Sequence, residues 1–253
     1  MPFPDLQRRD VVLDGARLSY LHRNAGGVVL VLIPGSFSDS EQWIDVVPEL
    51  DAGLSLILVE LRGHGGSWPP PKNGSIEQFA EDVLTIVDDA GVGPFYVGGH
   101  SIGGMVALEV GRICPARVKG VLSVEGWTDH RVPGDAFDGD ICGTLSPEQN
   151  AWRLASRERV TAQWTDEQQQ SFGRIWRRWD GYDFLCRTAL PILEVYGDRG
   201  CGPVGRERLH IPDRANIELC WLDGASHSLP LERPRELAAT LNAFIARVAE
   251  EEV

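Results

Sequence analysis

The sequence predicts an α/β fold, a mostly parallel sheet with helices on both of its faces. Short apolar runs rich in β-branched residues alternate along the chain with longer segments of helical periodicity. Several runs, such as VVLVLI at residues 28–33, are apolar without alternation, which is typical of strands buried on both faces of a parallel sheet. Strands that alternate with helices in this way favour parallel pairing through helical crossovers.

A β-hairpin and six buried strands make up the predicted sheet. We expect the hairpin around Asp14-Gly15, a turn pair between two short apolar runs. Buried strands are expected over residues 28–33, 54–59, 95–97, 118–124, 192–196 and 217–221. Helices are expected over residues 75–90, 101–113 and 233–249. The first helix is the best marked, because Ser75 suits its N-cap and Gly91 its end.

Residues 126–188 interrupt this alternation with a segment that has no convincing strand. The segment is rich in tryptophan: Trp127, Trp152, Trp164, Trp176 and Trp179. We interpret it as a small helical lid inserted into a core formed by residues 1–125 and 189–253. Open sheets of this kind bind ligands beyond the carboxyl ends of their strands, where the insertion begins. A simpler interpretation, that most of these tryptophans form a second small core, stays open.

Charge and composition argue against several classes of partner. The 253 residues carry a formal net charge of −13, and no basic stripe is present to neutralise a nucleic acid or an anionic membrane surface. No window approaches the roughly 18 consecutive apolar residues of a membrane span, and the N-terminus lacks the pattern of a secretory signal. Five Cys without a C-x-x-C pair are typical of reduced thiols, so a cytoplasmic location is expected.

No cofactor and no metal are expected. A metal site needs His, Cys or carboxylates clustered at ligand spacing, and a dinucleotide loop needs G-x-G-x-x-G after the first strand, and the sequence offers neither. The expected partner is therefore a small-molecule substrate, and nothing in the sequence indicates an oligomeric state.

The strongest local motif is Gly99-His100-Ser101-Ile102-Gly103, which matches G-x-S-x-G. It follows a predicted strand and begins a predicted helix, which is the setting that this motif requires. A serine on such a sharp turn has strained backbone angles, and side chains at the two glycines would collide with neighbouring elements. The helix N-terminus also favours negative charge that develops near the serine. These features predict a nucleophile at Ser101.

Together with this motif, three further segments resemble the α/β-hydrolase family over nearly the whole chain: LRGHGGS at residues 61–67, PGSF at residues 34–37 and GASH at residues 224–227. They are similar to the turn after the family's fourth strand, to its oxyanion loop and to its final histidine turn. Two positions depart from the family pattern. Glu60 stands where the family has Asp, and Pro34 stands where a histidine often precedes the oxyanion glycine. The second departure leaves the hydrogen bonding inside that loop open.

Chain order and the resemblance together assign roles to five further residues. Of the six histidines, His227 alone follows the last predicted strand and precedes the last helix, so it is expected to be the general base. The oxyanion hole is expected to use the backbone N–H of Ile102 and that of Ser36, with Phe37 as the alternative to Ser36. Phe37 and Trp127 are expected to line an apolar substrate pocket.

The acid of the triad is open between two carboxylates. The family's usual acid lies three residues after the glycine that ends the seventh strand, and this chain has Gly200 there. Asp198 comes two residues earlier and is expected to point into solvent or toward Arg199. Glu125 ends the sixth predicted strand, where a subset of haloalkane dehalogenases and some lipases carry their acid. We predict Glu125, keep Asp198 as the alternative, and note that Glu125 could instead pair with Arg131.

These residues predict a serine hydrolase. Ser101, His227 and the acid would cleave a small to medium, largely apolar ester, thioester or lactone through an acyl-enzyme. A serine nucleophile excludes the mechanism of dehalogenases and epoxide hydrolases, which needs an aspartate. Alternatives are a carbon-carbon bond hydrolase, a lyase or cofactor-free peroxide enzyme, and a ligand-binding or receptor-like protein on the same scaffold.

Overall fold

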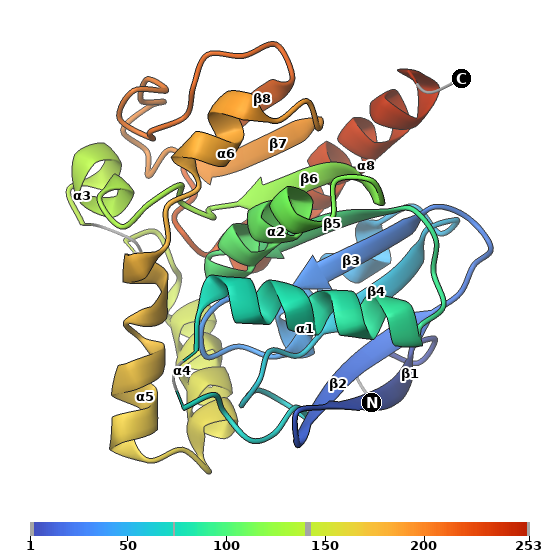
Figure 1. The fold of residues 1–253 in the computed structure, drawn as a ribbon. Coiled ribbons are helices and arrows are strands. Elements are labelled where there is room, and N and C mark those ends of the chain that lie inside the picture. The colour runs from blue at the N-terminus through green and yellow to red at the C-terminus, as the bar shows by residue number, and fades with distance from the viewer. Residues whose placement is uncertain (1–2, 73, 140–142, 252–253) are drawn as a thin grey trace.

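An eight-stranded sheet forms the centre of the protein (Figure 1). The computed structural model describes residues 3–72, 74–139 and 143–251. The strand order across the sheet is β1-β2-β4-β3-β5-β6-β7-β8, and within the described residues β2 is the strand that runs antiparallel to its neighbours. The bounds are β1 (Gln7–Leu13), β2 (Ala16–Arg23), β3 (Val29–Ile33), β4 (Ser55–Val59), β5 (Phe95–His100), β6 (Val118–Val124), β7 (Ile192–Gly197) and β8 (Ile217–Leu222).

The predicted fold class is confirmed, and each predicted strand corresponds to an observed one. The hairpin β1–β2 turns at Asp14 and Gly15, which both have positive φ. β5 is three residues longer than expected from its apolar run. Gly98 and Gly99 continue its parallel pairing with β6, opposite Leu122 and Ser123, so the strand reaches the motif itself.

Helices cover both faces of the sheet (Figure 1). α1 (Ile76–Asp89) and α2 (Ile102–Ile113) pack on one face, and α8 (Pro234–Glu251) packs on the other. Side chains of β3 alternate between the two cores: Val31 and Ile33 belong to the core of α1 and α2, whereas Leu30 and Leu32 belong to the core of α8. Because both faces are covered, β3 is apolar at every position.

The segment between β6 and β7 contains the helices α3 (Val132–Phe137), α4 (Pro147–Thr161), α5 (Asp166–Phe172), η3 (Ile175–Arg178) and α6 (Tyr182–Arg187), and no strand among its described residues. We call residues 126–188 the helical insertion. In Figure 1 the arrowheads of β3 and β6 point toward the side of the molecule where α3, α4 and α5 lie. Two short helices after β3, η1 (Ser40–Trp43) and η2 (Val47–Glu49), and α7 (Leu229–Glu232) complete the elements.

Two tryptophans of the insertion join the hydrophobic core on the face of the sheet that α1 and α2 cover, so the insertion has no separate core of tryptophans among the described residues. Trp164 packs against the rings of Phe37 and Phe172 and donates its indole N–H to the carbonyl of Gly63 at 2.7 Å. Trp179 is buried and donates to the carboxylate of Glu109 at 3.1 Å. These contacts attach the insertion to the loop after β4 and to α2.

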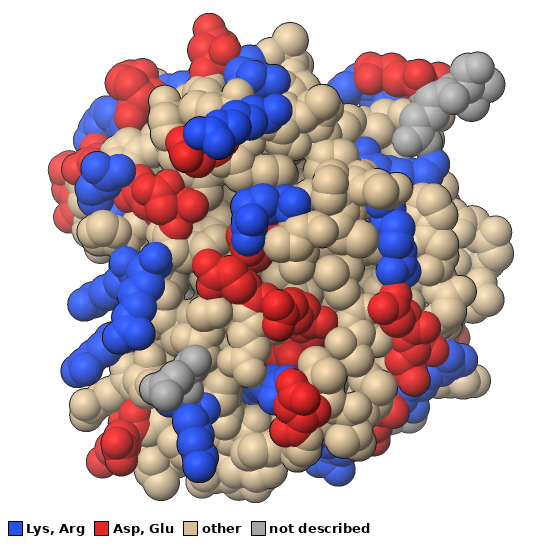
Figure 2. Space-filling view, in the orientation of Figure 1, with Lys and Arg blue, Asp and Glu red and all other residues tan. Residues whose placement is uncertain are grey.

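The surface in Figure 2 shows acidic and basic side chains interspersed, with a group of basic side chains near the end of α5. Within the described residues, no helix is both long enough and apolar enough to cross a membrane. The described part of the chain also contains no group of three or more His, Cys, Asp or Glu able to hold a metal ion. Cys114, Cys186, Cys201 and Cys220 are free, and Cys142 lies outside the described residues.

Candidate active site

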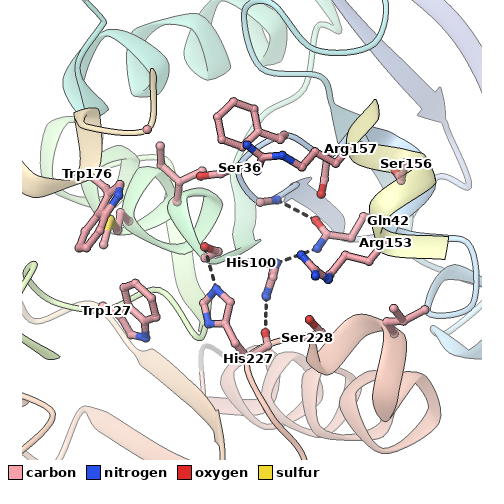
Figure 3. Close-up of a pocket in the computed structure, with 18 of the residues that line it drawn as sticks. Ser36, Gln42, His100, Trp127, Arg153, Ser156, Arg157, Trp176, His227 and Ser228 are labelled. Carbon is pink, nitrogen blue, oxygen red and sulfur yellow. Dashed lines mark hydrogen bonds between the residues drawn. The ribbon is translucent and has the colours of Figure 1, made fainter. Parts of the chain in front are cut away.

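A pocket of about 290 Å³ lies where the carboxyl ends of β3 and β5 meet the helical insertion. Its floor comes from the loop after β3, the turn between β5 and α2, and the loop after β8, and its roof comes from α4 and η3. Figure 3 shows the side chains that converge on it. The pocket lies at the edge of the sheet where open α/β folds bind their ligands.

Ser101 occupies the turn between β5 and α2 with φ 56° and ψ −124°, an unfavourable conformation for a residue with a side chain. The turn is possible because of the two glycines of the motif. A Cβ atom on Gly99 would lie 2.2 Å from the carbonyl oxygen of Gly103. A Cβ on Gly103 would lie 2.3 Å from the carbonyl oxygen of Ile33. The motif therefore needs glycine at both positions for steric reasons.

Ser101, His227 and Glu125 form a continuous chain of hydrogen bonds. The hydroxyl of Ser101 lies 3.0 Å from Nε2 of His227, the geometry in which it donates to the imidazole (Figure 3). Nδ1–H of His227 donates to Oε2 of Glu125 at 3.0 Å. Three residues from the ends of three different strands, separated by up to 126 positions, thus meet at one point.

Glu125 is fully buried and fully provided with hydrogen-bond donors. Oε1 accepts from the N–H of Gly197 at 2.8 Å and from Nη1 of Arg199 at 2.6 Å, and Oε2 accepts from Nη2 of Arg199 at 2.8 Å and from His227. Burial alone raises the pKa of Glu125, but the hydrogen bonds from Arg199 and His227 outweigh it and lower the pKa to about 2. The carboxylate therefore stays ionised beside the imidazole.

The expected surroundings of the two carboxylates need correction. Arg199 turns its guanidinium to Glu125, and Asp198 is buried rather than exposed to solvent. Oδ1 of Asp198 accepts from the N–H groups of Gly200 at 2.8 Å and Gly224 at 2.7 Å, so it closes the loops after β7 and β8. Arg131 pairs with Asp129 and not with Glu125. A local sequence pattern could not reveal these pairings, because Arg199 and Glu125 are 74 positions apart.

Ser36 and Ile102, which were expected to supply the two oxyanion donors, both line the pocket. Among the described residues, neither backbone N–H has a partner within the protein. Phe37 was the alternative to Ser36, and the structure contradicts it. The N–H of Phe37 donates to Nε2 of His64 at 3.0 Å, and His64 is fully buried. This N–H is therefore not available to a substrate oxyanion.

A hydrogen-bond chain without any signature in the sequence supports the loop after β3, where the oxyanion hole was expected. The N–H of Gly35 donates to Oε1 of Gln42 at 2.7 Å, and the Gln42 amide donates to Nδ1 of His100 at 2.7 Å. Nε2–H of His100 donates in turn to the carbonyl of His227 at 2.6 Å (Figure 3). Burial lowers the pKa of His100 to about 3, so the ring is neutral and keeps this tautomer. Gln42 thus provides the hydrogen bonding inside this loop, which the sequence left open because Pro34 replaces the family's histidine.

The walls of the pocket are largely apolar and carry two cations. Phe37 and Trp127, both expected to line it, do so, and the Trp127 ring lies 4.7 Å from the His227 ring. Met105, Trp152 and Trp176 extend this apolar lining. Sequence reasoning missed two further lining residues, Arg153 and Arg157 of α4. The helical period of α4 places them one turn apart, but it could not show which face turns toward Ser101.

Comparison with known proteins agrees with this architecture. Residues 28–198 match the family model described as alpha/beta hydrolase fold. The chain belongs to this family. It is 36% identical, over an alignment of 246 residues that covers 88% of this chain, to the dihydrolipoyllysine-residue acetyltransferase component of the acetoin cleaving system of Pseudomonas putida. It spans 64% of that relative's length and 30% of the corresponding component of Cupriavidus necator.

Solved structures show the same fold. Est816, an N-acyl homoserine lactone degrading enzyme, superimposes with a TM-score of 0.72 at 24% identity, covering 93% of this chain and 100% of its own. A loop variant of a haloalkane dehalogenase from Bradyrhizobium elkanii superimposes with a TM-score of 0.77 at 14% identity, covering 98% and 99%. At these identities the likeness establishes the fold and leaves the chemistry to the residues of the site.

Proposed function

We propose that the protein is a serine hydrolase that cleaves a small to medium, largely apolar carboxylic ester, thioester or lactone through an acyl-enzyme. The observation that carries this proposal is the hydrogen-bond chain from Ser101 through His227 to Glu125 at the floor of the pocket. The N–H groups of Ser36 and Ile102, two residues that line the pocket and whose N–H groups have no partner among the described residues, complete the set of groups that acyl transfer needs.

In the first half-reaction Ser101 attacks the substrate carbonyl carbon while Nε2 of His227 takes the hydroxyl proton. The carbonyl oxygen becomes an oxyanion and accepts hydrogen bonds from the N–H groups of Ser36 and Ile102. Each such donor lowers the barrier by about 3–4 kcal/mol. The tetrahedral intermediate then collapses, and the imidazolium gives its proton to the departing alcohol or thiol. In the second half-reaction His227 activates water in the same way, and the acyl group leaves as a carboxylate.

Glu125 fixes the tautomer of His227 and stabilises its imidazolium form. Arg199 shares the same carboxylate through both of its terminal nitrogens, which holds the acid in position and compensates part of its charge. The acid of this triad therefore serves a second cation besides the histidine.

A second candidate is acyl transfer to an acceptor other than water, which the relative from Pseudomonas putida favours because its printed name is that of an acetyltransferase. The acylation step is the same in both cases. Deacylation distinguishes them, because a transferase releases its acyl group much faster to a thiol or alcohol acceptor than to water.

The test is intact-mass labelling with a fluorophosphonate, followed by turnover of p-nitrophenyl butyrate. We expect a single adduct on the wild type and none on Ser101→Ala, together with p-nitrophenol release that requires Ser101. Adding dihydrolipoamide separates the two candidates, since only a transferase would form the S-acyl product in preference to butyrate. Absence of an adduct on folded wild-type protein would refute an activated serine and favour a ligand-binding protein.

A further inference from the structure

Two arginines project from α4 into the pocket without a carboxylate to neutralise them. Figure 3 shows Arg153 and Arg157 extending toward the side that holds Ser36, Gln42 and His100. Among the described residues, neither arginine forms an ion pair. By contrast, Arg159 on the same helix turns away to Asp39 and Glu41.

The two guanidinium groups lack part of the hydrogen bonding and charge pairing that they could form. Nη2 of Arg153 donates to Asn150 at 2.9 Å, but its Nε is buried and has no partner among the described residues. Arg157 lies over the ring of Phe37, with Cζ 4.0 Å from the ring centre. Burial, and then the positive charge of Arg153, lower the pKa of Arg157, so the two cations repel one another. Asp166 borders the adjoining hollow beside Arg157 but makes no ion pair with it.

Residues 147–178, which include α4, differ in charge from the chain as a whole. Residues 147–178 contain six arginines and four carboxylates, whereas the chain has a net charge of −13. Arg153 is half-buried and Arg157 is exposed at the mouth of the pocket, yet the Nε of Arg153 is buried without a partner and the two cations repel one another, and a bound anion would remove both costs. The planar fork of arginine suits a carboxylate in particular.

We propose that Arg153 and Arg157 bind a carboxylate group of the substrate, so that the preferred substrate is an ester or thioester that carries a free carboxylate on an otherwise apolar body. This inference rests on the proposed function, because it assigns the substrate of the same site. The carboxylate binds at the α4 wall, and the scissile carbonyl then reaches Ser101 on the floor. The apolar part of the substrate contacts Phe37, Trp127 and Trp176.

The test compares substrates that differ chiefly in the presence of a free carboxylate. Mono-p-nitrophenyl adipate and p-nitrophenyl hexanoate carry the charge difference in the acyl part, and 4-acetoxybenzoate and its methyl ester carry it in the leaving group. We expect the wild type to prefer the anionic member of at least one pair. The double variant Arg153→Met/Arg157→Met should reduce that preference, as a ratio of kcat/KM values, by about 10- to 100-fold, because hydrogen bonds to charged groups are lost. Turnover of the neutral member should change less than about threefold.

Arg187→Gln serves as a surface-charge control, because the Arg187 side chain is 78% exposed and lies outside the pocket. It removes the same kind of charge and should leave the ratio unchanged. Equal losses for neutral and anionic substrates in the double variant would overturn the inference, because the arginines would then stabilise the oxyanion or the fold. No preference in either pair of substrates would overturn it as well.

A binding measurement keeps the inference separate from the proposed chemistry. In the Ser101→Ala variant, quenching of the pocket tryptophans reports binding of the adipate and hexanoate esters without turnover. We expect tighter binding of the adipate ester, and loss of that difference when Arg153 and Arg157 are also replaced. If no serine adduct forms but this difference persists, the hydrolase proposal fails while the anion site stands. If the serine is active and the two esters bind equally, the anion site fails alone.

Discussion

Replacement of Glu125 by glutamine tests the acid assignment most directly, with Asp198→Asn as its matched control. Each substitution converts a carboxylate to an amide of nearly the same volume and removes one negative charge. The two differ in what the lost oxygen accepts. Glu125 accepts from four N–H groups through both oxygens, whereas the hydrogen bonds that Asp198 accepts from Gly200 and Gly224 both end on Oδ1.

The expected loss in kcat for each variant follows from the hydrogen bonds that its carboxylate accepts. An amide at position 125 can keep its oxygen toward Gly197 and one nitrogen of Arg199, but its NH₂ group then faces Nδ1–H of His227. His227 must move its proton to Nε2, where it can no longer accept the proton of Ser101. The corresponding loss in a serine protease triad is about 10⁴-fold in kcat, so we expect a loss of about 10³- to 10⁴-fold here. The amide introduced at position 198 can keep the hydrogen bonds from Gly200 and Gly224 on its oxygen, and His227 pairs with Glu125 instead, so we expect less than about a threefold loss there.

The assay is kcat for p-nitrophenyl butyrate, with the thermal unfolding temperature measured on the same samples. The unfolding temperature is needed because Glu125→Gln leaves Arg199 less well paired, which destabilises a buried site by several kcal/mol. Rates are therefore compared well below the unfolding transition. A larger loss for Asp198→Asn than for Glu125→Gln would refute the acid assignment, and retention of more than about a tenth of kcat by Glu125→Gln would refute the tautomer argument.

Three further predictions concern stability and the oxyanion loop. Burial lowers the pKa of His64 to about 4 and that of His100 to about 3. Below about pH 6.5 the unfolded chain binds protons at these two histidines and the folded protein does not, so the unfolding temperature should fall from pH 7 to pH 4. A constant unfolding temperature would contradict buried neutral rings. Gln42→Leu should lower kcat/KM for a neutral ester about 10- to 100-fold by leaving His100 and the loop unpaired, whereas a loss under twofold would mean that the loop holds itself. Gly99→Ala should lower the free energy of unfolding in urea by more than about 3 kcal/mol. Gly93→Ala, whose Cβ would meet nothing within 4 Å, should lower it by less than about 1 kcal/mol. Similar values for the two variants would contradict the steric argument.

The motif around Ser101 was predictable because its constraint is local. Two glycines, a preceding buried strand and a following helix are all contained in about twenty consecutive residues. His227 was predictable from chain order, given the family resemblance. Its partner was less certain, because two carboxylates, Glu125 and Asp198, end neighbouring strands and no local pattern says which of them faces the imidazole.

The arrangement around Ser101, His227 and Glu125 depends on contacts between distant segments. Arg199 follows β7 in sequence, yet its guanidinium crosses to the carboxylate at the end of β6. His64 accepts the N–H of Phe37, which leaves Ser36 and Ile102 as the candidate oxyanion donors. Neither residue carries a pattern that marks its partner, since each pairing is fixed by how loops pack once the sheet has formed.

The order of strands and helices, the elbow with its serine and the final histidine were all encoded locally, because periodicity, turn residues and the steric demand for glycine act over a few residues. The wall of the pocket that faces Ser101 was not encoded locally. Arg153 and Arg157 lie on α4, where helical period defines a face but the docking of the insertion on the core sets what that face meets. Burial, charge pairing and the tautomers of buried histidines follow from that docking, because each depends on atoms brought together from distant parts of the chain.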